Sequence, residues 1–231
     1  MAEDDESFME VGDTLLEDLR AHGGLRRNSH VVDIGCGYGR VAHALIRSRF
    51  RGVYRGFDIL PRHVEWCIQN LGDSRIRFEH LDVRNDRYNP DGQHDAATVD
   101  LQLLPGWADV MLATSVFTHM WPGEVTNYLK QVGPGLRRRG RGYLTFFLLS
   151  HHWQRMVDAG KVQAYPLPYQ GDGPYRFMNP DNPLHVIAYE QDWVEQQVAA
   201  AGLSIVSLRF GSWSGRESDV YQDTIVVRRA I

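Results

Sequence analysis

The sequence predicts an α/β fold in which helices alternate with the strands of a mostly parallel sheet. First, an apolar segment at 31–34 is followed at once by three glycines and then by apolar residues at helical spacing up to Ile46. Second, the order of strand and helix recurs further along the chain. Third, the short link at 211–216 joins the last two predicted strands, which predicts an antiparallel hairpin there.

The glycine-rich turn at 35–39 predicts a site for a nucleotide-like ligand. Gly35, Gly37 and Gly39 allow a sharp change of direction after the strand, and the following helix presents its amino end above the sheet. A dinucleotide-binding fingerprint needs its third glycine three residues after the second, and at that position after Gly37 this chain has Arg40. A nicotinamide-dependent oxidoreductase is therefore disfavoured.

The remaining elements follow from apolar periodicity. An amphipathic helix at 10–22 is expected to cover the sheet or the ligand. The polar segment 84–106 is long enough to indicate a functional loop. Further strands are predicted at 53–58, 76–80, 108–113, 142–149, 203–210 and 220–227, and further helices at 61–71, 123–132 and 191–201.

Length and composition narrow the class of protein. With 231 residues, 43% of them hydrophobic, the chain fits a single domain, 1–231, with a sizeable core. A formal charge of −4 argues against nucleic acid as the main partner, and the arginines at 137–141 are expected on a solvated turn. Two cysteines predict neither a disulfide framework nor a metal site. No membrane-spanning or export segment is recognisable, so a cytoplasmic protein is expected.

Two sequence patterns are typical of one enzyme family. The segment Asp33-Ile34-Gly35-Cys36-Gly37-Tyr38-Gly39, together with the loop Ser115-Val116-Phe117-Thr118-His119-Met120, resembles class I S-adenosylmethionine-dependent methyltransferases. Trp213-Ser214-Gly215-Arg216 and Gln222-Asp223 are similar to a bacterial subgroup. The resemblance implies a Rossmann-like, seven-stranded, mostly parallel sheet with an antiparallel C-terminal hairpin and helices on both faces.

The resemblance also implies S-adenosylmethionine as cofactor, with S-adenosylhomocysteine as product. Asp33 would lie near the amino group of the methionyl moiety, and Asp82 would take the adenine amino group. Asp58 ends a strand about twenty residues past the glycines, where a carboxylate can accept both ribose hydroxyls. The expected cofactor-binding residues are Asp33, Gly35, Cys36, Gly37, Arg40, Asp58, Ile59, Leu60, Asp82, Val83, Thr114 and Ser115.

Three histidines are candidates for a general base. His119 follows the strand whose end would face the methyl group, and His151 and His152 follow the next predicted strand. The alternative for His119 is a structural histidine beneath the cofactor. The alternative for the other two is a place on the surface at the start of a loop.

The expected activity is methyl transfer to a small molecule or glycan, at oxygen. Residues 150–189 lack periodicity and are rich in aromatic residues and proline, which favours an insertion that shapes the acceptor pocket. An alternative is a catalytically silent domain that binds the cofactor or a partner. An RNA or protein methyltransferase ranks lower because the chain lacks a basic face. Nothing in the sequence indicates the oligomeric state.

Overall fold

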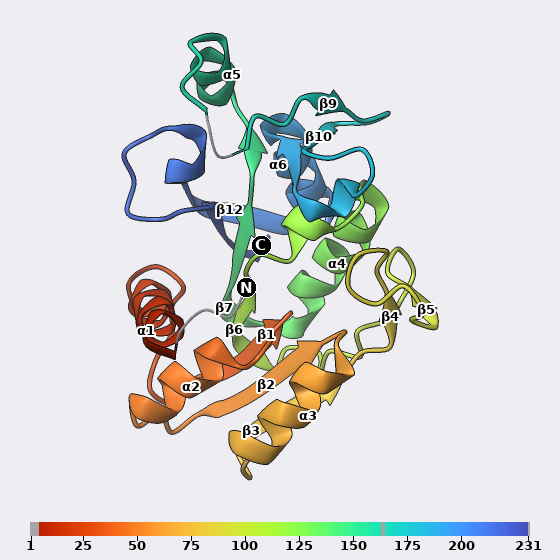
Figure 1. Ribbon diagram of the computed structural model, residues 1–231. Coiled ribbons are helices and arrows are strands. Elements are labelled where there is room, and N and C mark those ends of the chain that lie inside the picture. The colour runs from red at the N-terminus through yellow and green to blue at the C-terminus, as the bar shows by residue number, and fades with distance from the viewer. Residues whose placement is uncertain (1–4, 163–164, 231) are drawn as a thin grey trace.

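The computed structural model describes residues 5–162 and 165–230, and its centre is a seven-stranded sheet (Figure 1). The strand order is β12-β13-β7-β6-β1-β2-β3. Neighbours from β7 to β3 run parallel, whereas β13 is antiparallel to both β7 and β12. This arrangement confirms the predicted fold class. The strands are β1 (His30–Ile34), β2 (Val53–Asp58), β3 (Ile76–His80), β6 (Ala108–Ala113), β7 (Leu136–Phe146), β12 (Leu203–Arg209) and β13 (Asp223–Arg229).

Helices cover both faces of this sheet, because successive side chains of a strand point to opposite sides. Val31 packs in one apolar cluster with α1, α2 and α3, whereas its neighbour Val32 packs in the other with α4 and α6. Val110 and Met111 of β6 are divided in the same way. The helices are α1 (Asp5–Ala21), α2 (Arg40–Arg47), α3 (Pro61–Asn70), α4 (Pro122–Gly135), α5 (His151–Asp158) and α6 (Gln191–Ala200).

The two segments without clear periodicity contain short elements. The segment 84–106 lies around a pair of two-residue strands, β4 (Val83–Arg84) and β5 (His94–Asp95). The predicted insertion, apart from positions 163–164, which lie outside the described residues, begins with α5, and the strands that follow α5 join β8, just before it, in a small sheet of order β8-β11-β10-β9. Its strands are β8 (Leu148–Leu149), β9 (Tyr169–Gln170), β10 (Tyr175–Phe177) and β11 (Ile187–Glu190).

The arginine run lies in a strand, so the predicted solvated turn is wrong. Residues 136–141 belong to β7, which pairs with β6 across a register shift between Ala108 and Val110. Arg137 donates from Nη1 to both carboxylate oxygens of Asp109, at 2.9 Å each. Strand β7 therefore begins at Leu136, ahead of its apolar part, because backbone pairing with β6 and this ion pair hold the arginine segment in place.

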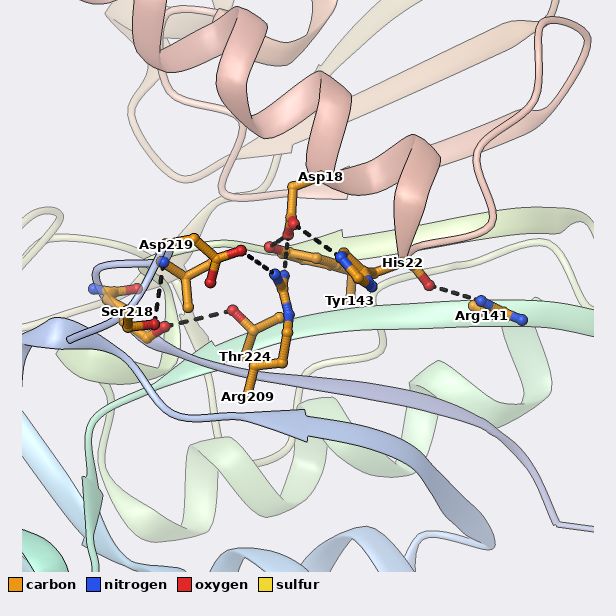
Figure 2. Close-up of polar contacts among 10 residues, drawn as sticks. Asp18, His22, Arg141, Tyr143, Arg209, Ser218, Asp219 and Thr224 are labelled. Atoms are coloured by element: carbon orange, nitrogen blue, oxygen red, sulfur yellow. Dashed lines mark hydrogen bonds and ion pairs between the residues drawn. The ribbon is translucent and has the colours of Figure 1, made fainter. Parts of the chain in front are cut away.

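Helix α1 is attached to the sheet by a polar cluster that joins three elements (Figure 2). Asp18 accepts hydrogen bonds from the Tyr143 hydroxyl of β7 and from the guanidinium of Arg209 at the end of β12. Arg141 donates to the backbone oxygen of His22 at 2.7 Å. These contacts fix the carboxyl end of α1 over strands that are remote in sequence.

Helix α1 also packs against α2. The guanidinium carbon of Arg40 lies 5.2 Å from the centre of the Phe8 ring. A Cβ atom at Gly12 would lie 3.1 Å from Cγ of Arg40, so glycine permits the close approach of the two helices.

We expect Asp18→Ala to lower the free energy of unfolding by about 1–3 kcal/mol, because it leaves two largely buried donors without their acceptor. Asp13→Ala is the matched control on the same helix. Asp13 pairs with Arg47 at 2.7 Å, but both side chains are more than 40% exposed, so the change should be within about 0.5 kcal/mol. Denaturant titration of both variants measures the difference, and equal effects would contradict this role of Asp18.

Candidate active site

A cavity of about 400 Å³ opens at the carboxyl edge of β1, β2 and β6. In a parallel sheet this edge collects the loops that follow each strand, and ligands bind there at the point where the strand order reverses. Here the chain continues from β1 to β2 on one side, whereas β6 lies on the other side of β1. The cavity is lined by Ile34, Gly35, Gly37, Arg40, Phe57, Asp58, Ile59, Leu60, His63, Leu81, Val83, Arg84, Asn85, Tyr88, Ala96, Ser115, Val116, His119, Met120 and Tyr128.

The glycine turn forms one wall of the cavity. Gly35 and Gly37 have φ values of +73° and +54°, which side chains rarely permit. A Cβ atom at Gly35 would lie 2.5 Å from Val116, whereas one at Gly37 would meet no atom within 4 Å. The turn is therefore packed from one side and leaves open space beside Gly37, where a bound molecule can approach the backbone.

The carboxylate of Asp58 holds this turn in place. It accepts from the backbone N–H of Gly37 at 2.7 Å and from that of Leu60 at 2.9 Å. Nδ1 of His63 lies 4.0 Å from the same side chain. Each carboxylate oxygen keeps a second lone pair, so the group can also accept ligand hydroxyls. This is the contact predicted for a ribose.

An apolar slot adjoins Asp58. Ile59 and Leu60 line the cavity together with Leu81 and Val83. Apolar side chains of this kind suit a flat heterocycle such as adenine. The structure does not bring Asp82 into this lining. Its Oδ1 instead accepts from the backbone N–H of Gln93 at 3.4 Å, because the chain turns there towards β5.

Asp33 and Cys36 lie behind the turn rather than on the cavity surface. Asp33 is buried and its Oδ2 accepts from the Tyr54 hydroxyl at 2.7 Å, while its Oδ1 has no hydrogen-bond partner among the described residues. Burial raises the pKa of Asp33 to about 7, although the Tyr54 hydrogen bond opposes this. Burial also raises the pKa of the Cys36 thiol. The open space at Gly37 and the Asp58 carboxylate on the cavity surface fit a cofactor that carries a ribose.

His119 is the predicted base that lines the cavity. It lies in the short helix η1 (Phe117–His119), and its Nδ1 is 2.9 Å from the backbone oxygen of Leu184. A carbonyl oxygen only accepts, so Nδ1 carries the proton and Nε2 is an acceptor. Burial lowers the pKa of His119, which keeps the ring neutral at neutral pH. A neutral imidazole with an unprotonated Nε2 can accept a proton from a bound acceptor molecule.

His151 and His152 do not line the cavity with His119. They begin α5, where His151 is exposed, and Ser150 caps the helix by accepting from the backbone N–H of Trp153. Burial and the nearby Arg216 lower the pKa of His152. They lie outside the cavity lining because the chain continues past β7 into β8 before α5 begins.

Of the other predicted residues, Gly35, Gly37, Arg40 and Ser115 line the cavity, and Thr114 does not. Sequence reasoning missed several lining side chains, among them His63, Asn85, Tyr88 and Tyr128. His63 was detectable, because the first turn of the helix that follows Asp58 must lie at the same edge. Tyr128 gave no signal, since an aromatic residue in an amphipathic helix is typical of a core.

Of the C-terminal residues that the sequence singled out, Trp213 and Asp223 are structural. Trp213 is buried and donates from Nε1 to Asp223 at 2.7 Å. Asp223 also accepts from the backbone N–H groups of Leu148 and Gly211. This carboxylate therefore joins β13, β8 and the link between the last two strands.

Residues 31–140 match the family described as "Methyltransferase domain". This region contains the glycine turn, Asp58 and His119. The match agrees with the predicted class, S-adenosylmethionine-dependent methyltransferases, and with the predicted cofactor. Neither a helix able to cross a membrane nor a cluster of three metal-ligating side chains occurs in the described ranges.

Solved structures with low sequence identity share the fold. A TehB-like S-adenosylmethionine-dependent methyltransferase of Corynebacterium glutamicum is 15% identical with a TM-score of 0.56, over 94% of this chain and 87% of that chain. The 1,6-didemethyltoxoflavin N1-methyltransferase of Burkholderia thailandensis, with bound S-adenosylhomocysteine, is 18% identical with a TM-score of 0.59, over 98% and 80%. Magnesium protoporphyrin IX methyltransferase of Synechocystis is 16% identical with a TM-score of 0.58, over 100% and 89%.

We expect Asp33→Asn to stabilise the protein more at high pH than at low pH. The folded-state pKa of about 7 lies above the ordinary 3.8, so folding opposes ionisation, and the cost grows from about pH 4 and is complete above pH 7. The amide removes this cost while still accepting from Tyr54. The variant should gain at most about 4 kcal/mol above pH 7 and almost nothing at pH 4. Denaturant titrations across this range measure the gain, and a pH-independent difference would contradict it.

Proposed function

We propose that this chain transfers the methyl group of S-adenosylmethionine to a hydroxyl oxygen of a small molecule or glycan, with His119 as general base. The observation that carries this proposal is the His119 ring at the cavity, with Nδ1 2.9 Å from the backbone oxygen of Leu184. The neutral tautomer that donates to this oxygen leaves Nε2 without a proton. A base is useful for a hydroxyl acceptor, because an amine or thiolate is already nucleophilic.

The residues that would hold the donor lie on the β1–β2 side of the cavity. The glycine turn would approach the methionyl moiety, Asp58 would accept the ribose hydroxyls, and Ile59 and Leu60 would lie against the adenine. Once bound, the donor supplies an electrophilic methyl group on a sulfonium centre. The protein then has to orient the acceptor and exclude water, which is the larger part of catalysis in such a displacement.

The acceptor would bind on the His119 side. The Tyr88 ring stands edge-on to the His119 ring, with centroids 5.4 Å apart, and the Asn85 amide donates to the His119 backbone oxygen at 2.9 Å. The contact with Leu184 comes from η2 (Pro183–His185), within the predicted insertion. We therefore infer that segments 84–106 and 150–189 together shape the acceptor pocket. In the reaction His119 Nε2 takes the hydroxyl proton as the oxygen becomes the nucleophile.

The proposal is tested by incubating the protein with donor labelled in the methyl group and a panel of hydroxylated small molecules and glycans. Label recovered on oxygen supports it. Label found only on nitrogen contradicts the choice of oxygen, and binding of the donor without any labelled product supports a catalytically silent domain.

We expect Asp58→Ala to reduce binding of S-adenosylhomocysteine by at least about a hundredfold, because it removes the ribose acceptor and the anchor of the glycine turn. Calorimetry with the purified variant measures the dissociation constant. The control is Asp82→Ala, a carboxylate outside the cavity lining, which should stay within about threefold of the unchanged protein. Unchanged affinity in Asp58→Ala would exclude this cavity as the donor site.

We expect His119→Gln to lower kcat by about 10²–10⁴-fold and to remove the acidic limb of the pH profile. In the unchanged protein kcat/KM should rise with pH through a pKa below the ordinary 6.5 of histidine and then level off. His151→Gln, at an exposed position outside the cavity, is the control and should leave both the rate and the limb unchanged. An acidic limb that persists in His119→Gln would show that another group is the base.

A further inference from the structure

Three residues in or next to separate strands, Ser115, Thr145 and Gln222, meet beside the cavity. The backbone N–H of Ser115 donates to Thr145 Oγ1 at 2.8 Å, and the Thr145 hydroxyl lies 2.6 Å from Gln222 Oε1. The Ser115 hydroxyl also donates to Gln222 Oε1, at 3.1 Å, across 107 residues of chain. Ser115 follows β6, Thr145 belongs to β7 and Gln222 immediately precedes β13.

Ser115 is held in an unfavourable backbone conformation. Its φ of +57° lies in the left-handed region, which costs a residue other than glycine free energy and persists only where the surroundings impose it. Its neighbour Val116 packs on Gly35 of the glycine turn. Ser115 therefore lies on the cavity surface next to the part of the turn that is expected to approach the methionyl moiety.

Both hydroxyls of this cluster donate to Gln222 Oε1. Thr145 Oγ1 accepts from the Ser115 N–H and gives its own proton to the glutamine carbonyl, which faces both hydroxyls. The Ser115 proton is directed to the same carbonyl. The lone pairs of Ser115 Oγ that remain can only accept hydrogen bonds.

We propose that Gln222 is a positioning residue whose side-chain carbonyl fixes the Ser115 hydroxyl as an acceptor for the α-ammonium group of the donor's methionyl moiety. The inference rests on the proposed function. An ammonium group only donates hydrogen bonds, so it can bind to a hydroxyl oxygen whose proton is already used in another hydrogen bond. The neighbouring carboxylate of the donor only accepts hydrogen bonds, so it cannot bind to such a hydroxyl. Asp33 cannot fill this place on the cavity surface, because it is buried behind the turn.

The test compares two probes that differ only in this group: S-adenosylhomocysteine and its deaminated analogue, which lacks the ammonium. Calorimetry on Gln222→Met, which has a similar shape but no acceptor, should show S-adenosylhomocysteine binding weakened about five- to thirtyfold and binding of the deaminated analogue unchanged. Gln222→Glu keeps an acceptor for both hydroxyls and should restore binding of S-adenosylhomocysteine.

Ser115→Ala should show the same selective loss, and the double variant with Gln222→Met should lose no more than either single variant, because both changes remove one contact. Ser115→Ala also carries the test if Gln222→Met does not fold. Unchanged affinity, or equal loss for both probes, would overturn the positioning role. If the unchanged protein binds neither probe, the proposed function itself fails; if it binds both equally tightly, only the ammonium contact fails.

Discussion

The hydrogen bonds that Asp58 accepts from Gly37 and Leu60 are the constraint on which the site depends. They join the turn after β1 to the start of the helix after β2. Gly35, Gly37 and Gly39 have positive φ and no side chains, so the backbone at these positions depends on contacts from other segments. One carboxylate therefore supports the wall of the cavity and keeps lone pairs for the proposed ribose contact, so a change at Asp58 affects both.

The fold could be predicted where one chain segment decides its own structure. Parallel strands buried on both faces, such as β1 and β6, are short apolar runs, and the helices between them keep their period. The elements that were missed depend on distant partners. Strands β4 and β5 have two residues each and exist because they pair with one another, and the start of β7 depends on Asp109 and on pairing with Ala108.

A site residue could be predicted from the sequence where the position of its backbone alone brings it to the cavity. It could not be predicted where the direction of its side chain determines whether it reaches the cavity. Gly35, Gly37 and Asp58 must lie at the carboxyl edge once the strands are placed, and they line the cavity. Asp33 and Asp82 also occupy strand ends, but Asp33 turns to Tyr54 and Asp82 turns to Gln93. Spacing along the sequence carries no information on that choice, because hydrogen-bond partners elsewhere in the chain make it.

The two sides of the cavity have different physical origins. The proposed donor side is built by the ends of β1 and β2, whose positions the central sheet fixes. The proposed acceptor side is built around η1, which is held by Asn85 from segment 84–106 and by Leu184 from segment 150–189. The Tyr189 hydroxyl of β11 also donates to the backbone oxygen of Met120, so the small sheet bears directly on the end of η1. Changes in these inserted segments can therefore alter the position of His119 and the shape of the acceptor pocket while the glycine turn and Asp58 stay in place. In such a fold the acceptor can diverge without loss of the donor site.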